Sequence, residues 1–209
     1  MPISERPVVQ VRDLYPQELP AAVALLARGF RDNPLPMATY GGNPERRQRC
    51  LGVLFGALFR TMTSQTPLVA LDGGVIVGVT GIAPPGTCQP TPRQRLSMVP
   101  RLVSLGPRSL LRVSSNVSAW AANDPEQGHS HLGPLAVDAD LRGRGIGSQI
   151  LTEYCRRLDN ANLMGYLETE TEDNVRLYGR FGLEVTSEQM VLGVPNWFMQ
   201  RPAQGSKTR

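Results

Sequence analysis

The sequence predicts a mixed α/β fold. Two β-rich runs, at 66–71 and 75–83, flank the turn Asp72-Gly73-Gly74, which is a hairpin signal. A third strand-like run, 131–137, leads through a glycine-rich segment into a run of apolar residues at helical spacing. Strands and helices thus follow one another along the chain, in an order typical of a mixed α/β fold.

The N-terminal half is predicted to contain one strand and two helices before the hairpin. Residues 8–14 alternate apolar and polar side chains, as a strand does. A helix is predicted over 17–31 and is expected to stop at Asn33-Pro34. Pro44 suits the first turn of a second helix, which is expected to run to about Met62.

The C-terminal half is predicted to begin with a proline-rich loop at 83–92. The elements expected after it are helices near 93–105 and 107–122, a loop at 123–128, a strand at 131–137, a helix at 146–159, a strand at 163–168, a helix at 173–181, and a hairpin of 183–192 and 197–201. We expect one domain over residues 1–209, with a core at about 8–201 and a polar, frayed tail at 202–209.

Composition and charge favour a folded protein that binds a small anion. The chain has 209 residues, of which 41% are hydrophobic, and this is enough for a sizeable core. Its net charge is +4, and its arginines are scattered along the sequence. Because no recognisable nucleic-acid-binding motif accompanies this charge, we expect a small polyanionic ligand and no nucleic-acid partner.

The cysteines and the hydropathy of the sequence indicate where in the cell the protein is expected. The three cysteines, Cys50, Cys88 and Cys155, show no paired metal-binding spacing, and we expect reduced thiols. Nothing in the sequence marks Cys88, in the proline-rich loop, as a nucleophile. The N-terminus lacks a signal-peptide pattern, and the longest apolar run, 51–59, is too short to span a bilayer. These observations predict a cytoplasmic protein with no membrane partner.

The segment Arg142-Gly-Arg-Gly-Ile-Gly-Ser148 is the most informative feature of the sequence. Glycine allows the backbone to approach a ligand closely. Because a helix is predicted to begin at Ile146, several free N–H groups and the positive end of the helix dipole point to one place. Such a place binds anions, most often phosphate, and Arg142 and Arg144 add positive charge beside it.

Two other phosphate-binding motifs do not fit this segment. A dinucleotide fingerprint requires G-x-G-x-x-G, but the position after Gly145 and Gly147 that should hold the third glycine is Ile150. A P-loop requires Gly-Lys-Ser/Thr after its glycines, which does not follow here. A purely structural tight turn remains the alternative.

Two motifs, in order, resemble the GNAT superfamily of N-acetyltransferases. Arg142-Gly-Arg-Gly-Ile-Gly147 is similar to the family's acetyl-CoA loop, Arg/Gln-x-x-Gly-x-Gly/Ala. Asn174-Val-Arg-Leu-Tyr178-Gly-Arg-Phe-Gly182 resembles its later Asn-x-x-x-Tyr…Phe-Gly segment, at the expected distance. The run Tyr166–Thr169 and the ending Trp197-x-Met-x-Arg201 resemble the puromycin N-acetyltransferase-like branch. The specific resemblance covers about residues 129–201.

The resemblance implies acetyl-CoA as cosubstrate and a GNAT fold, with a mostly antiparallel sheet, helices on both faces and strands that splay at 133–137. The splayed strand would offer backbone groups to the pantetheine arm, and the loop would donate N–H groups to the pyrophosphate. The implied cofactor-binding residues are Leu135, Ala136, Val137, Arg142, Gly143, Arg144, Gly145, Ile146, Gly147, Ser148 and Asn174. Pro134, which lacks an N–H, suits a splayed strand, although an ordinary strand edge would accept it equally.

Acetyl transfer to an amine needs a proton acceptor and a proton donor. An alkylamine with a pKa near 10.4 is unprotonated in only about one molecule in 2,500 at pH 7, a deficit of roughly 4.6 kcal/mol. A base or a dehydrating pocket must offset this deficit, and an acid must protonate the departing thiolate. The resemblance places Tyr178 beside the thioester sulfur, and a tyrosine with a pKa near 10 suits the acid role. The alternative is a core tyrosine packed beneath its helix.

Two pairs of residues, each two positions apart, are candidates for the acceptor side. His129 and His131 face one side of a strand if the strand begins there, and Glu168 and Glu170 have the same relation at the end of the neighbouring strand. Glu168 is predicted to be a base that acts through water, or else an anchor for the substrate ammonium or for a loop. His129, His131 and Glu170 are weaker substrate-binding candidates, and either histidine is open to a structural role. We expect no metal, because no third ligand is placed to complete a His-x-His zinc site.

The sequence therefore predicts direct acetyl transfer from acetyl-CoA to a primary amine in a ternary complex. The resemblance to an antibiotic-modifying branch favours a small-molecule acceptor, while a peptide N-terminus and a protein lysine stay open. The loop at 84–92 and the helices between 93 and 122 are expected to cover the acceptor pocket. The alternatives are a non-catalytic CoA-binding or regulatory module and a longer acyl donor. A homodimer is compatible with such a fold.

Overall fold

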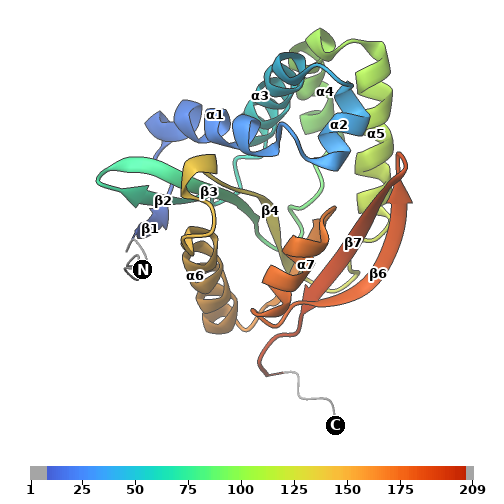
Figure 1. Ribbon diagram of the computed structural model, residues 1–209. Coiled ribbons are helices and arrows are strands. Elements are labelled where there is room, and N and C mark those ends of the chain that lie inside the picture. Colours follow the sequence, from blue (N-terminus) through green and yellow to red (C-terminus); the bar gives the residue numbers. More distant parts are fainter. Residues whose placement is uncertain (1–8, 206–209) are drawn as a thin grey trace.

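In a computed structural model, which describes residues 9–205, seven strands form one sheet. They are β1 (Gln10–Asp13), β2 (Leu68–Asp72), β3 (Val75–Ala83), β4 (His129–Val137), β5 (Met164–Thr169), β6 (Glu184–Val191) and β7 (Val194–Arg201). Their order across the sheet is β1-β2-β3-β4-β5-β7-β6 (Figure 1). β4 and β5 are parallel, and the other neighbours pair antiparallel. The predicted mixed, mostly antiparallel sheet is confirmed.

Helices cover both faces of this sheet (Figure 1). They are α1 (Leu19–Phe30), α2 (Pro34–Tyr40), α3 (Pro44–Thr61), α4 (Pro92–Leu102), α5 (Pro107–Ala121), α6 (Ile146–Ala161) and α7 (Glu172–Gly179). α1 and α3 share a core with one face of the sheet, and α6 packs against the opposite face. Within residues 9–205, no helix combines the length and the apolar character that crossing a membrane requires.

The alternation of side chains in β2 explains why both faces are covered. Val69 and Leu71 belong to the core formed with α1 and α3, whereas Leu68 and Ala70 pack with residues of α6. Successive side chains of a strand point to opposite faces. All four are buried, so this strand needs a helical layer on each side.

β4 and β5 diverge in the middle of the sheet. Their pairing ends at His131, opposite Tyr166, while β4 continues beside β3 as far as Val137. Within the described chain, residues 132–137 therefore have no strand partner on the β5 side. Pro134 lies where the pairing of β4 with β3 is also irregular, so its missing N–H breaks no regular ladder hydrogen bond.

The structure corrects the predicted elements in three places. α2 was not predicted, because prolines at 34 and 36 indicate a break; a proline in the first turn needs no N–H partner, so a new helix begins at Pro34. β4 begins at His129, two residues before the predicted start. β7 begins at Val194 instead of 197, because Leu192 and Gly193, with φ of 51° and 78°, form a two-residue hairpin turn.

Two predictions at the ends of the chain reach beyond the described residues. Val8, at the start of the first predicted strand, lies outside them, and so do residues 206–209 of the predicted tail. In the described part of the tail, the N–H of Gly205 donates to Oδ1 of Asn162 at 3.0 Å.

Candidate functional site

A cavity of about 1220 Å³ opens where β4 and β5 diverge. The glycine loop and the start of α6 line part of it, and Cys88, Glu168 and Tyr178 are among the residues that line the rest. The loop at 84–92, α4 and α5 also contribute to its walls, as the sequence predicts. One cavity thus adjoins both motifs of the sequence.

The glycine loop presents backbone N–H groups to this cavity. Gly143 and Gly145 have φ of 77° and 84°, a conformation that favours glycine. Gly145 is the residue before α6, so the N–H groups of the first α6 residues, Ile146 to Ser148, have no partner within the helix. Gly147 has an ordinary φ, and a Cβ there would lie 3.7 Å from Val137. The loop therefore has the geometry of an anion site.

Side chains of the loop differ in where they point. Arg142 lines the cavity and donates from Nη2 to the carbonyl of Gly29, at 3.0 Å, near the end of α1. Arg144 is exposed and is not among the lining residues. The side chain of Ile146 is buried in the core with Ala70, so this residue can serve a ligand only through its backbone.

The unpaired edge of β4 forms another wall. Leu135, Ala136 and Val137 all line the cavity. Their partners on β3 are Thr80, Val79 and Gly78, and β5 has already turned away at this level. The edge therefore leaves main-chain groups available to an extended ligand.

Two residues of the second motif lie on α7. Asn174 donates from Nδ2 to Oγ1 of Thr169, at 3.1 Å, and it lines the cavity together with Tyr178. Tyr178 is buried, and burial raises the pKa of its hydroxyl, as do the nearby charges of Glu170 and Glu168. The hydroxyl of Tyr178 therefore keeps its proton at neutral pH and can act as a donor.

The two glutamates at the end of β5 also line the cavity, but they have different partners. Oε2 of Glu168 lies 2.8 Å from Nε2 of His131, although the two atoms are not aligned as a hydrogen bond. Glu170 follows β5 and accepts a hydrogen bond, at 3.0 Å, from Nδ2 of Asn33, which lies between the end of α1 and the start of α2. Burial raises the pKa of Glu170, and the bond from Asn33 opposes this shift.

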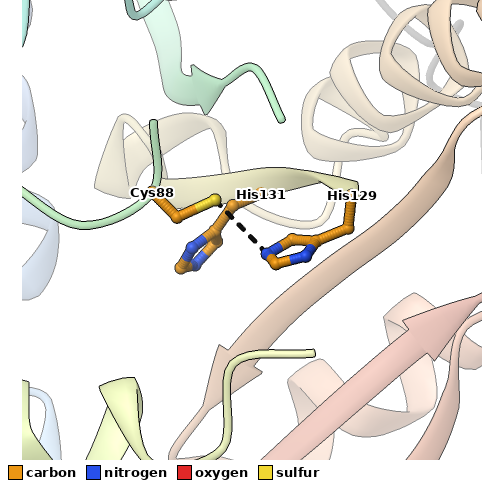
Figure 2. Close-up of side chains that lie close together, drawn as sticks. All are labelled: Cys88, His129 and His131. Carbon is orange, nitrogen blue, oxygen red and sulfur yellow. Dashed lines mark hydrogen bonds between the residues drawn. The ribbon is translucent and has the colours of Figure 1, made fainter. Parts of the chain in front are cut away.

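The two histidines project from the same side of β4, as predicted for a strand that begins at His129 (Figure 2). Their rings are 6.4 Å apart, and both pack edge-on against the ring of Tyr166. Cys88 approaches them from the 84–92 loop, with its Sγ 3.3 Å from Nε2 of His129. The premise that no third ligand accompanies the two histidines is therefore wrong, because a ligand atom of Cys88 lies within 4.8 Å of one from each histidine.

Contacts within this cluster shift the pKa values of its members. Burial raises the pKa of the Cys88 thiol, but hydrogen bonds with His129 and His131 outweigh burial and lower it to about 7. Burial lowers the pKa of His131, but the charge of Glu168 and the bond with Cys88 outweigh burial and raise it. Burial lowers the pKa of His129, but its contacts with Cys88, Gln127 and Asp124 together outweigh burial and raise it. The cluster therefore favours a thiolate beside imidazolium rings.

Sequence reasoning missed two members of this region, Cys88 and Asn33. Both lie far along the chain from their partners, His129 and Glu170, and neither belongs to a local motif. Only the fold brings them to the cavity.

Comparisons with known proteins agree with this geometry. Residues 34–183 match the model of the acetyltransferase (GNAT) family. An N-acetyltransferase of Escherichia coli K12 without a characterised function, YhbS, is 39% identical over 56 residues, which are 27% of this chain and 32% of that protein. The chain thus matches about a third of the length of this curated relative.

Solved structures share the fold. An acetyltransferase of Corynebacterium glutamicum, described as histone acetyltransferase HPA2 and related acetyltransferase, has a TM-score of 0.74 at 23% identity, over 96% of this chain and 99% of that one. The polyamine N-acetyltransferase of Drosophila melanogaster has a TM-score of 0.62 at 17% identity, over 92% and 99%. A Brucella melitensis GNAT acetyltransferase, solved with acetyl-CoA, has a TM-score of 0.54 at 18% identity, over 97% and 92%.

The family match extends over most of the chain and includes both the glycine loop and the residues that line the divergence of β4 and β5. The chain belongs to the acetyltransferase (GNAT) family.

Proposed function

We propose that this protein transfers an acetyl group from acetyl-CoA to a primary amine of a small molecule, by direct attack in a ternary complex. The observation that carries the proposal is that one cavity adjoins the glycine loop, Glu168 and Tyr178. A donor bound at the loop and an amine bound near the carboxylate would then share one space, and the acetyl group need not pass through a covalent intermediate on the protein.

The donor end of the cavity would bind acetyl-CoA through its main chain. The N–H groups of Gly143 and of residues 145–148 would donate to the pyrophosphate, assisted by the dipole of α6 and the charge of Arg142 and Arg144. The β4 edge at 135–137 would pair with the amide groups of the pantetheine arm. Asn174 would donate to the cofactor in place of its bond to Thr169.

The catalytic proton transfers are assigned to Glu168 and Tyr178. Glu168 would accept a proton from the ammonium form of the substrate, directly or through a water, and so expose the lone pair that attacks the thioester carbonyl. Tyr178 would donate its proton to the departing sulfur, and its raised pKa keeps that proton in place until the thiolate forms. The carboxylates of Glu168 and Glu170 also favour an acceptor that arrives as an ammonium ion.

A small amine as acceptor is supported by two likenesses. The chain resembles the puromycin N-acetyltransferase-like branch at Tyr166–Thr169 and at its Trp197-x-Met-x-Arg201 ending. It also shares its fold with the Drosophila enzyme that forms N-acetylagmatine. We therefore favour a small amine over a protein lysine or a peptide N-terminus.

Calorimetry and a thiol-release assay test this proposal in two steps. Titration with CoA up to millimolar concentration should show binding, and absence of binding would refute the proposal. Acetyl-CoA is then supplied with a panel of small amines, peptide N-termini and lysine peptides, and free CoA is measured. Release that depends on a small amine is expected. CoA binding without release for any amine would instead indicate a non-catalytic CoA-binding module.

A further inference from the structure

Three side chains of the types that ligate metals, Cys88, His129 and His131, lie close together, and two of them, Cys88 and His131, line the cavity (Figure 2). Ligand atoms of Cys88, His129 and His131 all lie within 4.8 Å of one another, and Sγ of Cys88 is 3.3 Å from Nε2 of His129. In a tetrahedral zinc site, Zn–S of about 2.3 Å and Zn–N of about 2.05 Å place the ligand atoms roughly 3.3–3.6 Å apart. The three side chains therefore need only small movements to share one ion.

The contacts of the two histidines leave one nitrogen of each ring to a metal, which would displace the proton that an imidazolium ring carries there. Nδ1 of His129 lies 2.9 Å from the carbonyl oxygen of Gln127. Because a carbonyl oxygen only accepts, Nδ1 of His129 holds a proton in either charge state of the ring, and Nε2, which faces Cys88, is the nitrogen left for a metal. Glu168 lies beside Nε2 of His131, so a proton held there leaves Nδ1 as the nitrogen for a metal. A backbone carbonyl and a carboxylate are the usual outer partners of metal-bound histidines.

The protein holds Cys88 beside the histidines by contacts on its own loop. Gln89, the next residue, donates from Nε2 to Oδ2 of Asp124 at 2.8 Å, and this bond ties the 84–92 loop to the segment before β4. The other oxygen of Asp124, Oδ1, lies 3.8 Å from Nε2 of His129. The ligand atoms thus come from two segments that are fixed to each other before any ion binds.

Several buried polar atoms around the cluster have no hydrogen-bond partner among the described residues. They are Oδ1 of Asp124, Nε2 of His131, the hydroxyl of Tyr166 and Oε2 of Glu168. The rings of His129 and His131 pack against the Tyr166 ring. Oδ1 of Asp124 lies 3.8 Å from Nε2 of His129, and Oε2 of Glu168 lies 2.8 Å from Nε2 of His131, so both carboxylates adjoin the cluster. Nε2 of His131 and Oε2 of Glu168 thus face each other, whereas Oδ1 of Asp124 and the hydroxyl of Tyr166 are left to a bound water or ion.

We propose that Cys88, His129 and His131 bind one zinc ion, with a fourth coordination position open to the cavity. One thiolate and two imidazoles favour zinc over magnesium or calcium, which prefer oxygen ligands. Cys88 and His131 line the cavity, so the fourth position faces water or a bound small molecule there. The thiolate halves the charge of the ion, and one of the nearby carboxylates, Asp124 or Glu168, is enough to balance the remaining positive charge. The proposal does not depend on acetyl transfer.

Metal binding to the full chain tests the proposal without any activity assay. The wild-type protein is stripped with a chelator, dialysed against zinc and separated from free ion, and metal is then measured by mass spectrometry. One zinc per chain is expected, with a rise in melting temperature that the chelator reverses. Cobalt in place of zinc should give the visible bands of tetrahedral cobalt and a sulfur-to-cobalt charge-transfer band.

Variants assign the site to the three residues. Cys88→Ser should lose the charge-transfer band, and His129→Gln should weaken zinc binding beyond the roughly 10–100-fold typical of losing an outer partner. Cys155→Ser is the matched control, because this buried thiol on α6 lies outside the cluster, and it should keep the full spectrum. Wild-type protein without stoichiometric zinc, or a cobalt spectrum without the sulfur band, overturns the proposal. The proposal is also overturned if Cys88→Ser and His129→Gln bind zinc as tightly as the wild-type protein.

Discussion

The two ends of the cavity are built in different ways. The proposed donor end comes mostly from one continuous stretch, residues 134–148, and offers main-chain groups at a strand edge and a helix start, with Asn174 added from α7. The acceptor end is assembled from side chains of distant segments, such as Asn33 with Glu170 and Cys88 with His129. A backbone site tolerates changes of side chain but depends on conformation. A side-chain site depends on each group and on the packing that holds it.

Glu168→Gln is expected to have the largest effect, and it tests whether the acceptor end does chemistry. Loss of a general base should lower turnover about 10²–10⁴-fold with little change in acetyl-CoA affinity. Steady-state kinetics with varied amine and varied acetyl-CoA measure both. Glu188→Gln, on the exposed face of β6, is the control and should retain full turnover. If Glu168→Gln raises only the KM for the amine, Glu168 binds the ammonium and is not the base.

Tyr178→Phe should lower turnover about 10–100-fold, because the thiolate would leave without a proton donor. The acetyl-CoA dissociation constant should hardly change. Because burial raises the pKa of Tyr178 above its usual 10, wild-type turnover should not decline through ionisation of this tyrosine as the pH rises from 7 to 10. Pre-steady-state rates over that range measure this, and turnover equal to wild type in Tyr178→Phe would remove its acid role.

Gly145→Ala probes the donor end, where conformation matters more than side chains. An alanine with φ near 84° is strained by about 1–2 kcal/mol, and relief of that strain should turn the first N–H groups of α6 away from the ligand. Acetyl-CoA affinity should fall about tenfold, which is about 1.4 kcal/mol of binding energy. Turnover at saturating acetyl-CoA should change little.

The matched control for Gly145→Ala is Gly74→Ala, in the β2–β3 turn, where φ is 85° and no atom lies within 4 Å of a new Cβ. Both variants should lose similar stability in thermal unfolding, and only Gly145→Ala should lose affinity by calorimetry. Equal loss of affinity in both would mean that global stability, and not the loop, governs binding.

Arg142→Ala should weaken acetyl-CoA binding about two- to fivefold, since an exposed charge contributes about 1 kcal/mol or less. The effect should shrink at high salt, because salt screens exposed charges. Arg156→Ala, which removes an exposed arginine paired with Glu153 on the same helix, should leave affinity unchanged. An Arg142 effect that is independent of salt would point to its bond with the Gly29 carbonyl instead.

The smallest expected effect concerns Glu170 and the pH dependence of stability. Burial raises the pKa of Glu170 in the folded chain, so the unfolded chain loses this proton first as pH rises. The contribution of Glu170 to stability is therefore full below its unfolded pKa, about 4.5, and declines as pH rises through the folded value. Glu170→Gln cannot ionise and should gain stability relative to wild type from pH 4 to pH 7. Denaturant unfolding measures both proteins across that range. A difference in unfolding free energy that does not change with pH would contradict this account.

The donor end could be predicted from the sequence because its signal is local. Glycines at alternate positions before a helical pattern determine both the left-handed backbone at Gly143 and Gly145 and the place where α6 begins. The apolar periodicity likewise predicts the strands and most helices. Helix α2 was not predicted, because the same prolines that end one helix are acceptable at the start of the next.

The sequence by itself determined the mixed α/β class, the hairpins, the conformation of the glycine loop and the positions of Glu168 and Tyr178 in their elements. The tertiary structure alone decided that Cys88 meets His129 and His131, that Asn33 holds Glu170, and that β4 leaves β5 at His131. The physical reason is the separation along the chain of the residues that interact. Backbone conformation depends on neighbouring residues, whereas a contact between positions 88 and 129 depends on how whole layers of helices and strands pack.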